Sequence, residues 1–195
     1  MHWISREQYE KLRKDAEVLE KDSYGEKVLK LVDGNFLKLF RRKSWFSKNT
    51  FVTPAQRFAN NAQALEDLDI PCPKVIGLYR VPNPFRSLVH YVPLEGHTLR
   101  ALLAGDPSRR AKAFAKLPEF VETLHDTGVY FRSLHLGNIV LTTDDRLGLI
   151  DISDLRIYSK PLSKSMRTRN YQHLLRYSDD WESFDESFIK QITKP

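Results

Sequence analysis

The chain has 195 residues, enough for one domain of two lobes or for two small domains that share a cleft. Its 31 Lys and Arg against 25 Asp and Glu give a net charge of +6, and the single cysteine, Cys72, excludes an internal disulfide. The charged first residues lack the apolar core of a signal peptide, and no run reaches the ~18 apolar residues of a membrane-spanning helix. We therefore expect a cytoplasmic protein, soluble or peripheral at the inner face of the membrane, without a transmembrane segment.

The positive charge is concentrated in three segments, 41–43, 109–116 and 156–169. Such segments attract phosphates, nucleic acid or an anionic membrane surface, but a solvated surface explains them equally well. We expect no nucleic-acid partner, because the chain shows no helix-turn-helix or stacking motif. Trp45 and Phe46, beside the first basic segment, are interpreted as packing residues or as a peripheral membrane contact.

The first forty residues begin with an ambiguous stretch and end in a hairpin. Tyr9, Leu12, Ala16 and Leu19 follow helical spacing, although residues 18–19 could instead open a strand. Further along, residues 27–32 and 36–40 alternate in hydropathy on either side of a turn at Asp33-Gly34-Asn35. The second pattern predicts two antiparallel strands.

A helix is predicted from Thr53 to Leu68, where Thr53 is a suitable N-cap and Pro54 suits the first helical position. Two strands are expected next, at 75–80 and 87–92, separated by a proline-rich turn.

The second half of the chain changes from strand to helix. Helices are expected at 98–103 and 108–127, the second either continuous or broken at Pro118. A short hairpin follows, with strands at 139–142 and 147–150. The remaining tail is interpreted as mostly helical.

Two polar residues flank the strands of this hairpin, and a phosphoryl-transfer site needs oxygen ligands of this kind for magnesium. Asn138 precedes one strand and Asp151 follows the other, thirteen residues later. Oxygen ligands of this kind are those that Mg²⁺ prefers, so the two residues are candidate metal ligands. The alternative is that Asn138 caps a turn and Asp151 ends a strand.

The segment around these residues resembles the catalytic loop and metal-binding segment of kinases. Phe131, Arg132 and Ser133 occupy the position of the His-Arg-Asp triplet, and Asn138 falls five residues after Ser133. The loop Leu134-His135-Leu136-Gly137-Asn138 is most similar to small bacterial kinases of the lipopolysaccharide-core type, including the toluene tolerance proteins. Residues 167–176 also resemble a C-terminal feature of the core kinases.

The resemblance implies a bilobal α+β fold: an N-lobe at 1–89, with a small antiparallel sheet and one helix, and a hinge with a reduced, mainly helical C-lobe at 90–195. It implies ATP and Mg²⁺ as cofactors. It assigns Gly25 to the nucleotide loop, Lys38 to the phosphates, and the segment His90-Tyr91-Val92 to the hinge. Arg132 would support the catalytic loop. Lys38 could otherwise be an ordinary strand residue that faces solvent.

The sequence departs from the kinase pattern in three places. Ser133 replaces the aspartate that orients the acceptor hydroxyl, and a serine is a poor base at neutral pH. No acidic residue lies between Thr53 and Leu65, which leaves Asn60, Asn61 or the late Glu66 to hold Lys38. Gly25 is the only glycine of the expected glycine-rich loop.

Two functions are compatible with this pattern. One is an ATP-dependent kinase that phosphorylates a sugar hydroxyl of the lipopolysaccharide core or a related envelope glycolipid. The other is a pseudokinase that keeps the pocket and acts in envelope or solvent-stress tolerance, which Ser133 favours. His135 is interpreted as a structural loop residue, with a role as substitute base as the alternative.

Overall fold

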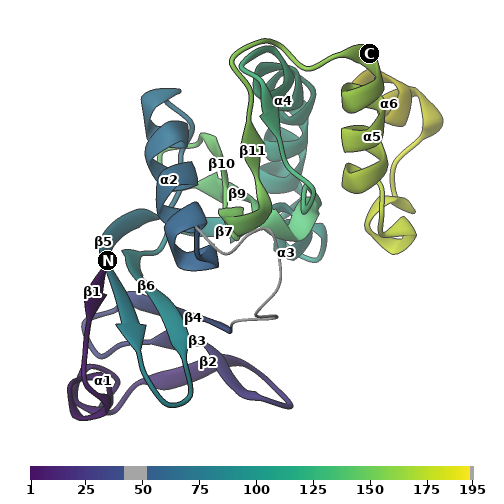
Figure 1. Cartoon of the computed structure of the whole chain (residues 1–195). Coiled ribbons are helices and arrows are strands. Elements are labelled where there is room, and N and C mark those ends of the chain that lie inside the picture. Colours follow the sequence, from purple (N-terminus) through teal and green to yellow (C-terminus); the bar gives the residue numbers. More distant parts are fainter. Residues whose placement is uncertain (42–51, 194–195) are drawn as a thin grey trace. The chain divides into compact units, whose positions relative to one another are not determined.

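The computed structural model describes residues 1–41 and 52–193 and divides into two compact units (Figure 1). Unit 1 comprises residues 1–63 and 73–93, and unit 2 comprises 64–72 and 94–195. Arg42, Lys43, Trp45 and Phe46, singled out above, lie outside the described residues. The fold is α+β, as predicted.

Unit 1 is built on a six-stranded sheet of order β1-β5-β6-β4-β3-β2. Its strands are β1 (His2–Trp3), β2 (Glu17–Asp22), β3 (Gly25–Lys30), β4 (Phe36–Arg41), β5 (Lys74–Val81) and β6 (Arg86–Val92). Four of the five pairings are antiparallel, but β1 runs parallel to β5. The sheet is therefore mixed, and the prediction of a purely antiparallel sheet is wrong at this edge, because a two-residue strand leaves no alternating pattern in the sequence.

The ambiguous N-terminal stretch contains a helix and then a strand. Helix α1 (Arg6–Leu12) begins with a capping box, in which Ser5 and Gln8 each bond the other's backbone N–H. Tyr9 is buried on the helix, whereas Val18 belongs to the exposed strand β2. Unit 1 thus holds α1 as well as part of α2, rather than the single helix expected.

The predicted hairpin is confirmed as β3 and β4. Leu29 pairs with Leu37 across the ladder, and both are fully buried with Leu88 of β6. Gly34 in the turn has φ +85°, in the left-handed region that glycine adopts without steric cost. The alternation of the sequence therefore marks which side chains enter the core of unit 1.

Helix α2 (Pro54–Asp67) also begins where the sequence predicts it. The Thr53 side chain accepts a hydrogen bond from the Gln56 backbone N–H at 3.2 Å. Phe58, Ala62 and Leu65 share the buried face, and the Phe58 ring lies 5.1 Å from that of Tyr91, centroid to centroid. These three positions recur every three to four residues, which is the spacing that places side chains on one face of a helix.

Unit 2 contains the remaining helices and two small sheets. The α-helices are α3 (Leu99–Leu103), α4 (Pro107–Asp126), α5 (Lys164–Leu174) and α6 (Glu186–Ile192). The strands are β7 (Gly96–Thr98), β8 (Val129–Tyr130), β9 (Ile139–Thr142), β10 (Leu147–Leu149) and β11 (Arg156–Ile157), in the orders β10-β9-β7 and β11-β8. Three short 3₁₀ helices complete it: η1 (Leu136–Asn138), η2 (Ile152–Asp154) and η3 (Ser178–Trp181).

Pro118 does not interrupt α4, which is one continuous helix. A proline removes one backbone hydrogen bond in a helix interior, so the break was a reasonable prediction. However, Leu117, Val121 and Leu124 are all fully buried, and burial of this face holds the helix together through Pro118. None of the helices within residues 1–41 and 52–193 has the length and apolar character needed to cross a membrane.

Candidate functional site

The predicted catalytic loop of unit 2 is held by its own polar groups. The Asn138 side-chain nitrogen donates to the Ser133 carbonyl at 2.9 Å and lies 3.2 Å from His135 Nε2. His135 caps η1, since its Nδ1 accepts from the Gly137 backbone N–H at 3.2 Å. These contacts orient the Asn138 amide and give His135 the structural role that the sequence favoured.

The β9–β10 hairpin brings Asn138 and Asp151 to neighbouring strand ends. Ile139 pairs with Leu149, and the Ile150 N–H donates to the Asn138 carbonyl at 3.0 Å. Asp151 follows directly, exposed, with φ +53° in the left-handed region. Asp and Asn adopt this conformation more readily than most residues, and Asp15, Asp69, Asn83 and Asp145 share it here.

The two residues fit part of a Mg²⁺ site. The Asn138 amide oxygen and the Asp151 carboxylate are hard oxygen ligands of the kind that Mg²⁺ prefers. In the described part of the chain, no three His, Cys, Asp or Glu side chains gather where they could hold a metal ion.

Ser133 contacts a carboxylate that the sequence analysis missed. Its hydroxyl donates to Asp154 Oδ2 at 2.8 Å. The other oxygen, Asp154 Oδ1, is buried and has no hydrogen-bond donor among the described residues. The only signal in the sequence was a second aspartate three residues after Asp151, and nothing in that spacing indicated contact with Ser133.

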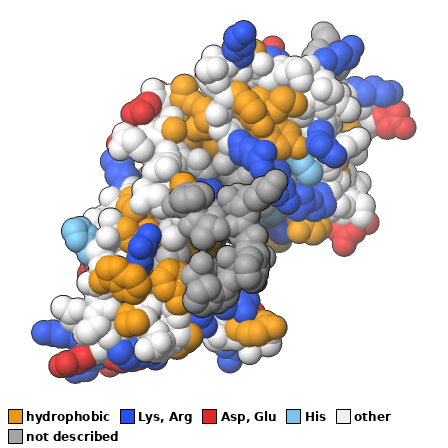
Figure 2. Space-filling view, viewed as in Figure 1, with side chains coloured by type: hydrophobic (Ala, Val, Ile, Leu, Met, Phe, Trp, Pro, Cys, Tyr) orange, Lys and Arg blue, Asp and Glu red, His pale blue; other side chains and the backbone are white. Residues whose placement is uncertain are grey.

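His173 of α5 lies among charged groups that include Asp154. Burial, followed by the charges of Arg176, Arg132 and Arg169, lowers the pKa of His173, while Asp154 acts in the opposite direction. The Arg176 guanidinium donates to the Arg132 carbonyl at 2.7 Å and lies 3.0 Å from His173 Nδ1. Figure 2 shows Lys and Arg side chains gathered beside a histidine on the visible face of unit 2. Arg132, Arg169, His173 and Arg176, which these contacts and charges connect, are called the basic cluster below, and its charge suits an anionic ligand.

A second set of contacts, from Arg100, Tyr177 and Asp180, lies against His135 of the predicted catalytic loop. Arg100 of α3 donates to both carboxylate oxygens of Asp180 at 2.7 to 3.1 Å, and its guanidinium lies 4.6 Å from the Tyr177 ring centroid. The Asp180 hydrogen bonds raise the pKa of Arg100. His135 lies against the same ring, and burial, then Arg100 and Arg176, lower its pKa. The imidazole is therefore held toward its neutral form.

The candidate nucleotide residues of unit 1 lie in the sheet. Lys38, in β4, pairs with Val28 and Val89, is half-buried, and has its Nζ 5.9 Å from the Phe40 ring centroid. His90 is buried in β6, where burial lowers its pKa despite the opposing charge of Asp33.

Val92 ends β6, and unit 1 ends one residue later at Pro93. The expected hinge segment 90–92 is therefore the last part of a strand. Asn60, a proposed partner of Lys38, accepts a hydrogen bond from Gln56 at 2.9 Å, and Glu66 is exposed on α2.

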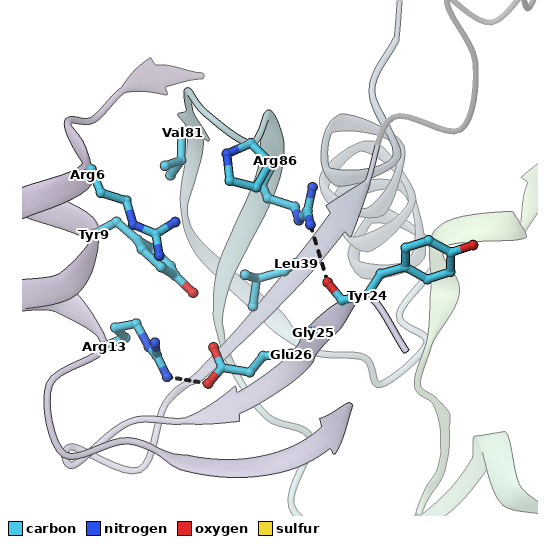
Figure 3. Close-up of a pocket in the computed structure, with 10 residues that line it drawn as sticks. Arg6, Tyr9, Arg13, Tyr24, Gly25, Glu26, Leu39, Val81 and Arg86 are labelled. Carbon is cyan, nitrogen blue, oxygen red and sulfur yellow. Dashed lines mark hydrogen bonds and ion pairs between the residues drawn. The ribbon is translucent and has the colours of Figure 1, made fainter. Parts of the chain in front are cut away.

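Gly25 lines a pocket of about 340 Å³ in unit 1. Figure 3 shows Arg6 and Arg13 on one side of this pocket and Arg86 on the other, with Leu39 between them. Arg13 forms an ion pair with Glu26, which also lines the pocket. Of the predicted nucleotide residues, only Gly25 is part of the lining, so this pocket does not gather the set that the resemblance assigned to ATP.

A scan against protein-family models and a search of curated proteins both found no match to this chain.

Proposed function

We propose that the chain is a kinase-like protein that binds ATP with Mg²⁺ and transfers phosphate to a sugar hydroxyl of the lipopolysaccharide core or a related envelope glycolipid. The observation that carries the proposal is the placement of Asn138 beside Asp151 by the β9–β10 ladder, with the Asn138 amide already oriented. Bound Mg²⁺ would neutralise charge on the nucleotide phosphates. The bilobal kinase fold and the phosphate contact of Lys38 rest on the sequence resemblance.

The chain's own residues would contribute mainly by positioning. Asn138 is fixed by the Ser133 carbonyl, and the chain that enters Asp151 is fixed by the hydrogen bond from the Ile150 N–H to the Asn138 carbonyl. Rigid polar groups of this kind supply most of the effect in phosphoryl transfer. An anionic acceptor is favoured because the arginines of the basic cluster act on the same histidine, His173, as the Asp154 carboxylate does. The same charge would suit an anionic membrane surface, which supports a peripheral location.

The alternative is a pseudokinase that binds nucleotide and acts through its shape. Ser133 favours it, because the expected base is a serine. The two functions differ only in turnover, so a phosphotransfer assay with core oligosaccharide as acceptor distinguishes them.

The first experiment is a thermal-shift titration with ATP and Mg²⁺. A ligand that binds only the folded state stabilises it by about 2.7 kcal/mol at one hundred times its Kd. We expect a higher melting temperature with ATP and Mg²⁺ than with ATP and excess EDTA. The lack of any shift at millimolar nucleotide would contradict both the kinase and the pseudokinase.

A further inference from the structure

The hydrogen bond between Ser133 and Asp154 changes what Ser133 can do chemically. A serine hydroxyl has one proton to donate and two lone pairs with which to accept. Here the proton is directed at Asp154 Oδ2 at 2.8 Å. The lone pairs of Ser133 Oγ are thus free to accept a proton from another group, which an isolated serine could do only weakly.

Asp154 has the properties of the group that receives that proton. Its Oδ1 is buried and, within residues 1–41 and 52–193, has no hydrogen-bond donor. Buried polar atoms in folded proteins are nearly always paired, and an exception calls for an explanation such as a catalytic role. Asp154 reaches this position because η2 turns the chain back after Asp151, which places the carboxylate against the loop that carries Ser133.

The same loop connects this pair to the candidate metal ligand. The Ser133 carbonyl accepts the hydrogen bond that orients Asn138, so Ser133 contacts Asp154 through its side chain and Asn138 through its backbone. The base position and the metal position are therefore held at a fixed separation by one residue.

We propose that Ser133 and Asp154 form a proton relay that replaces the single catalytic aspartate of a kinase, an inference that rests on the proposed function. The acceptor hydroxyl gives its proton to Ser133 Oγ as its oxygen attacks the γ-phosphorus of ATP. The Ser133 proton passes to Asp154 Oδ2 in the same step. The new O–P bond forms, the bond from the γ-phosphorus to the bridging oxygen breaks, and ADP leaves. Ser133 is the catalytic residue, and Asp154 acts through it.

The relay is tested by ATP hydrolysis, with water as the acceptor, in the full chain. We expect Ser133→Ala and Asp154→Asn each to lower kcat by ~10²-fold or more, the usual size of general-base help. The KM for ATP with Mg²⁺ and the thermal shift should stay at the parent's values, because neither residue contacts the nucleotide. Ser133→Thr keeps the hydroxyl and should retain most of the rate.

The double variant Ser133→Ala with Asp154→Asn separates a relay from two independent structural effects. Residues that act as one unit are strongly non-additive, so the double variant should be no slower than either single variant. Asp144→Asn, at an exposed position in the β9–β10 turn, is the matched control and should keep the parent's kcat. Lys38→Met defines the background rate.

The relay is overturned if either single variant keeps the parent's kcat, if the two losses multiply in the double variant, or if the parent hydrolyses no faster than Lys38→Met. In each of those outcomes, an intact thermal shift with ATP and Mg²⁺ would still support nucleotide binding while the relay is rejected. The absence of that shift would instead reject the proposed function itself. Because Asp154→Asn keeps an oxygen for Ser133 to donate to, its melting temperature should match the parent's, and Ser133→Ala tests the relay independently.

Discussion

Asn170 of α5 lies 3.0 Å from His125 of α4, side-chain oxygen to ring Nε2, and both residues are fully buried. The nitrogen of the same Asn170 amide donates to the Phe131 carbonyl at 2.7 Å. One side chain thus joins two helices to the start of the candidate catalytic loop. This buried contact therefore fixes where the loop begins.

Replacing Asn170 with alanine should destabilise the protein by ~1–3 kcal/mol, because the change leaves buried polar groups of His125 and Phe131 without partners. Urea unfolding followed by circular dichroism measures the loss. Asn60→Ala, at an exposed position on α2, is the control and should stay within ~0.5 kcal/mol of the parent. A loss no larger than that of the control would show that the buried contact contributes nothing.

Stability should fall as the pH drops from 7 toward 5. His90, His125, His135 and His173 all have pKa values lowered in the folded state, with burial as the largest cause. The unfolded chain, with histidine pKa values near ~6.5, therefore binds more protons in this range. Protonation then favours unfolding, so the stability present at pH 7 is lost below ~6.5.

Urea unfolding at a series of pH values measures that slope. His125→Gln should flatten it, because it removes one of the buried groups. Carboxylates with lowered pKa values, such as Asp145 beside Lys112 and Lys116, affect stability only at more acid pH. A slope of the opposite sign between pH 7 and 5 would contradict the histidine explanation.

The sequence predicted the elements whose side chains alternate or repeat clearly. The β3–β4 hairpin and α2 appear where expected, because each buries a regular apolar face. The β9–β10 hairpin also appears where expected, because its short apolar strands are buried along their whole length. The sequence did not predict β1 and β7. Strands of two and three residues are too short to show an alternation of hydropathy, and these two form by pairing with β5 and β9. The hydropathy pattern of the sequence was therefore enough to predict the longer elements, but not the strands that depend on pairing with distant residues.

The candidate site was predictable only in part, for a similar reason. Asn138 and Asp151 flank two strands that pair with each other, so their approach follows from the hairpin. The Ser133–Asp154 contact depends on how η2 folds back after a residue at positive φ, which no sequence period signals. The capping box of Ser5 and Gln8, by contrast, is visible in the sequence as a serine followed three residues later by a glutamine, and it marks the start of α1.

Asp151→Asn should reduce the Mg²⁺-dependent part of the ATP thermal shift while leaving the melting temperature of the free protein nearly unchanged. The substitution removes the charge of a candidate metal ligand and preserves its volume. The shift with ATP and EDTA serves as the internal control, since it does not depend on the ion. Equal Mg²⁺-dependent shifts in the variant and the parent would remove Asp151 from the metal site.

Gly148→Ala should destabilise unit 2 by ~1–3 kcal/mol. A Cβ at this position would lie 2.5 Å from the Pro71 carbonyl oxygen and 2.7 Å from a Leu94 methyl carbon. Leu149 next to it donates its N–H to that same carbonyl at 2.9 Å, so β10 cannot move away without losing a bond. Gly105→Ala, whose nearest neighbours are 3.6 Å away, is the control, and equal melting temperatures for the two variants would refute the clash.

Ser133→Asp should not raise ATP hydrolysis above the parent's rate. A carboxylate at this position would lie against Asp154, which Ser133 now contacts at 2.8 Å, and two like charges at that distance repel. We expect a lower melting temperature and a lower kcat. A clear gain in rate would mean that a lone carboxylate suffices at this position and would speak against the relay.

In the β9–β10 hairpin, the length of the turn and the register of the two strands are fixed by different contacts, although both contribute to the number of residues between Asn138 and Asp151. Its turn is held by ion pairs from Lys112 and Lys116 to Asp145, whereas the pairing of Ile139 with Leu149 sets where Asn138 and Asp151 emerge. An insertion in the turn would lengthen the chain between the two polar residues without moving either of them. A one-residue shift within β10 would keep the count nearly the same and reverse the faces of the strand. In distant relatives of this chain, the two polar residues should therefore keep their positions relative to the paired strands, even where the interval between them is not thirteen residues.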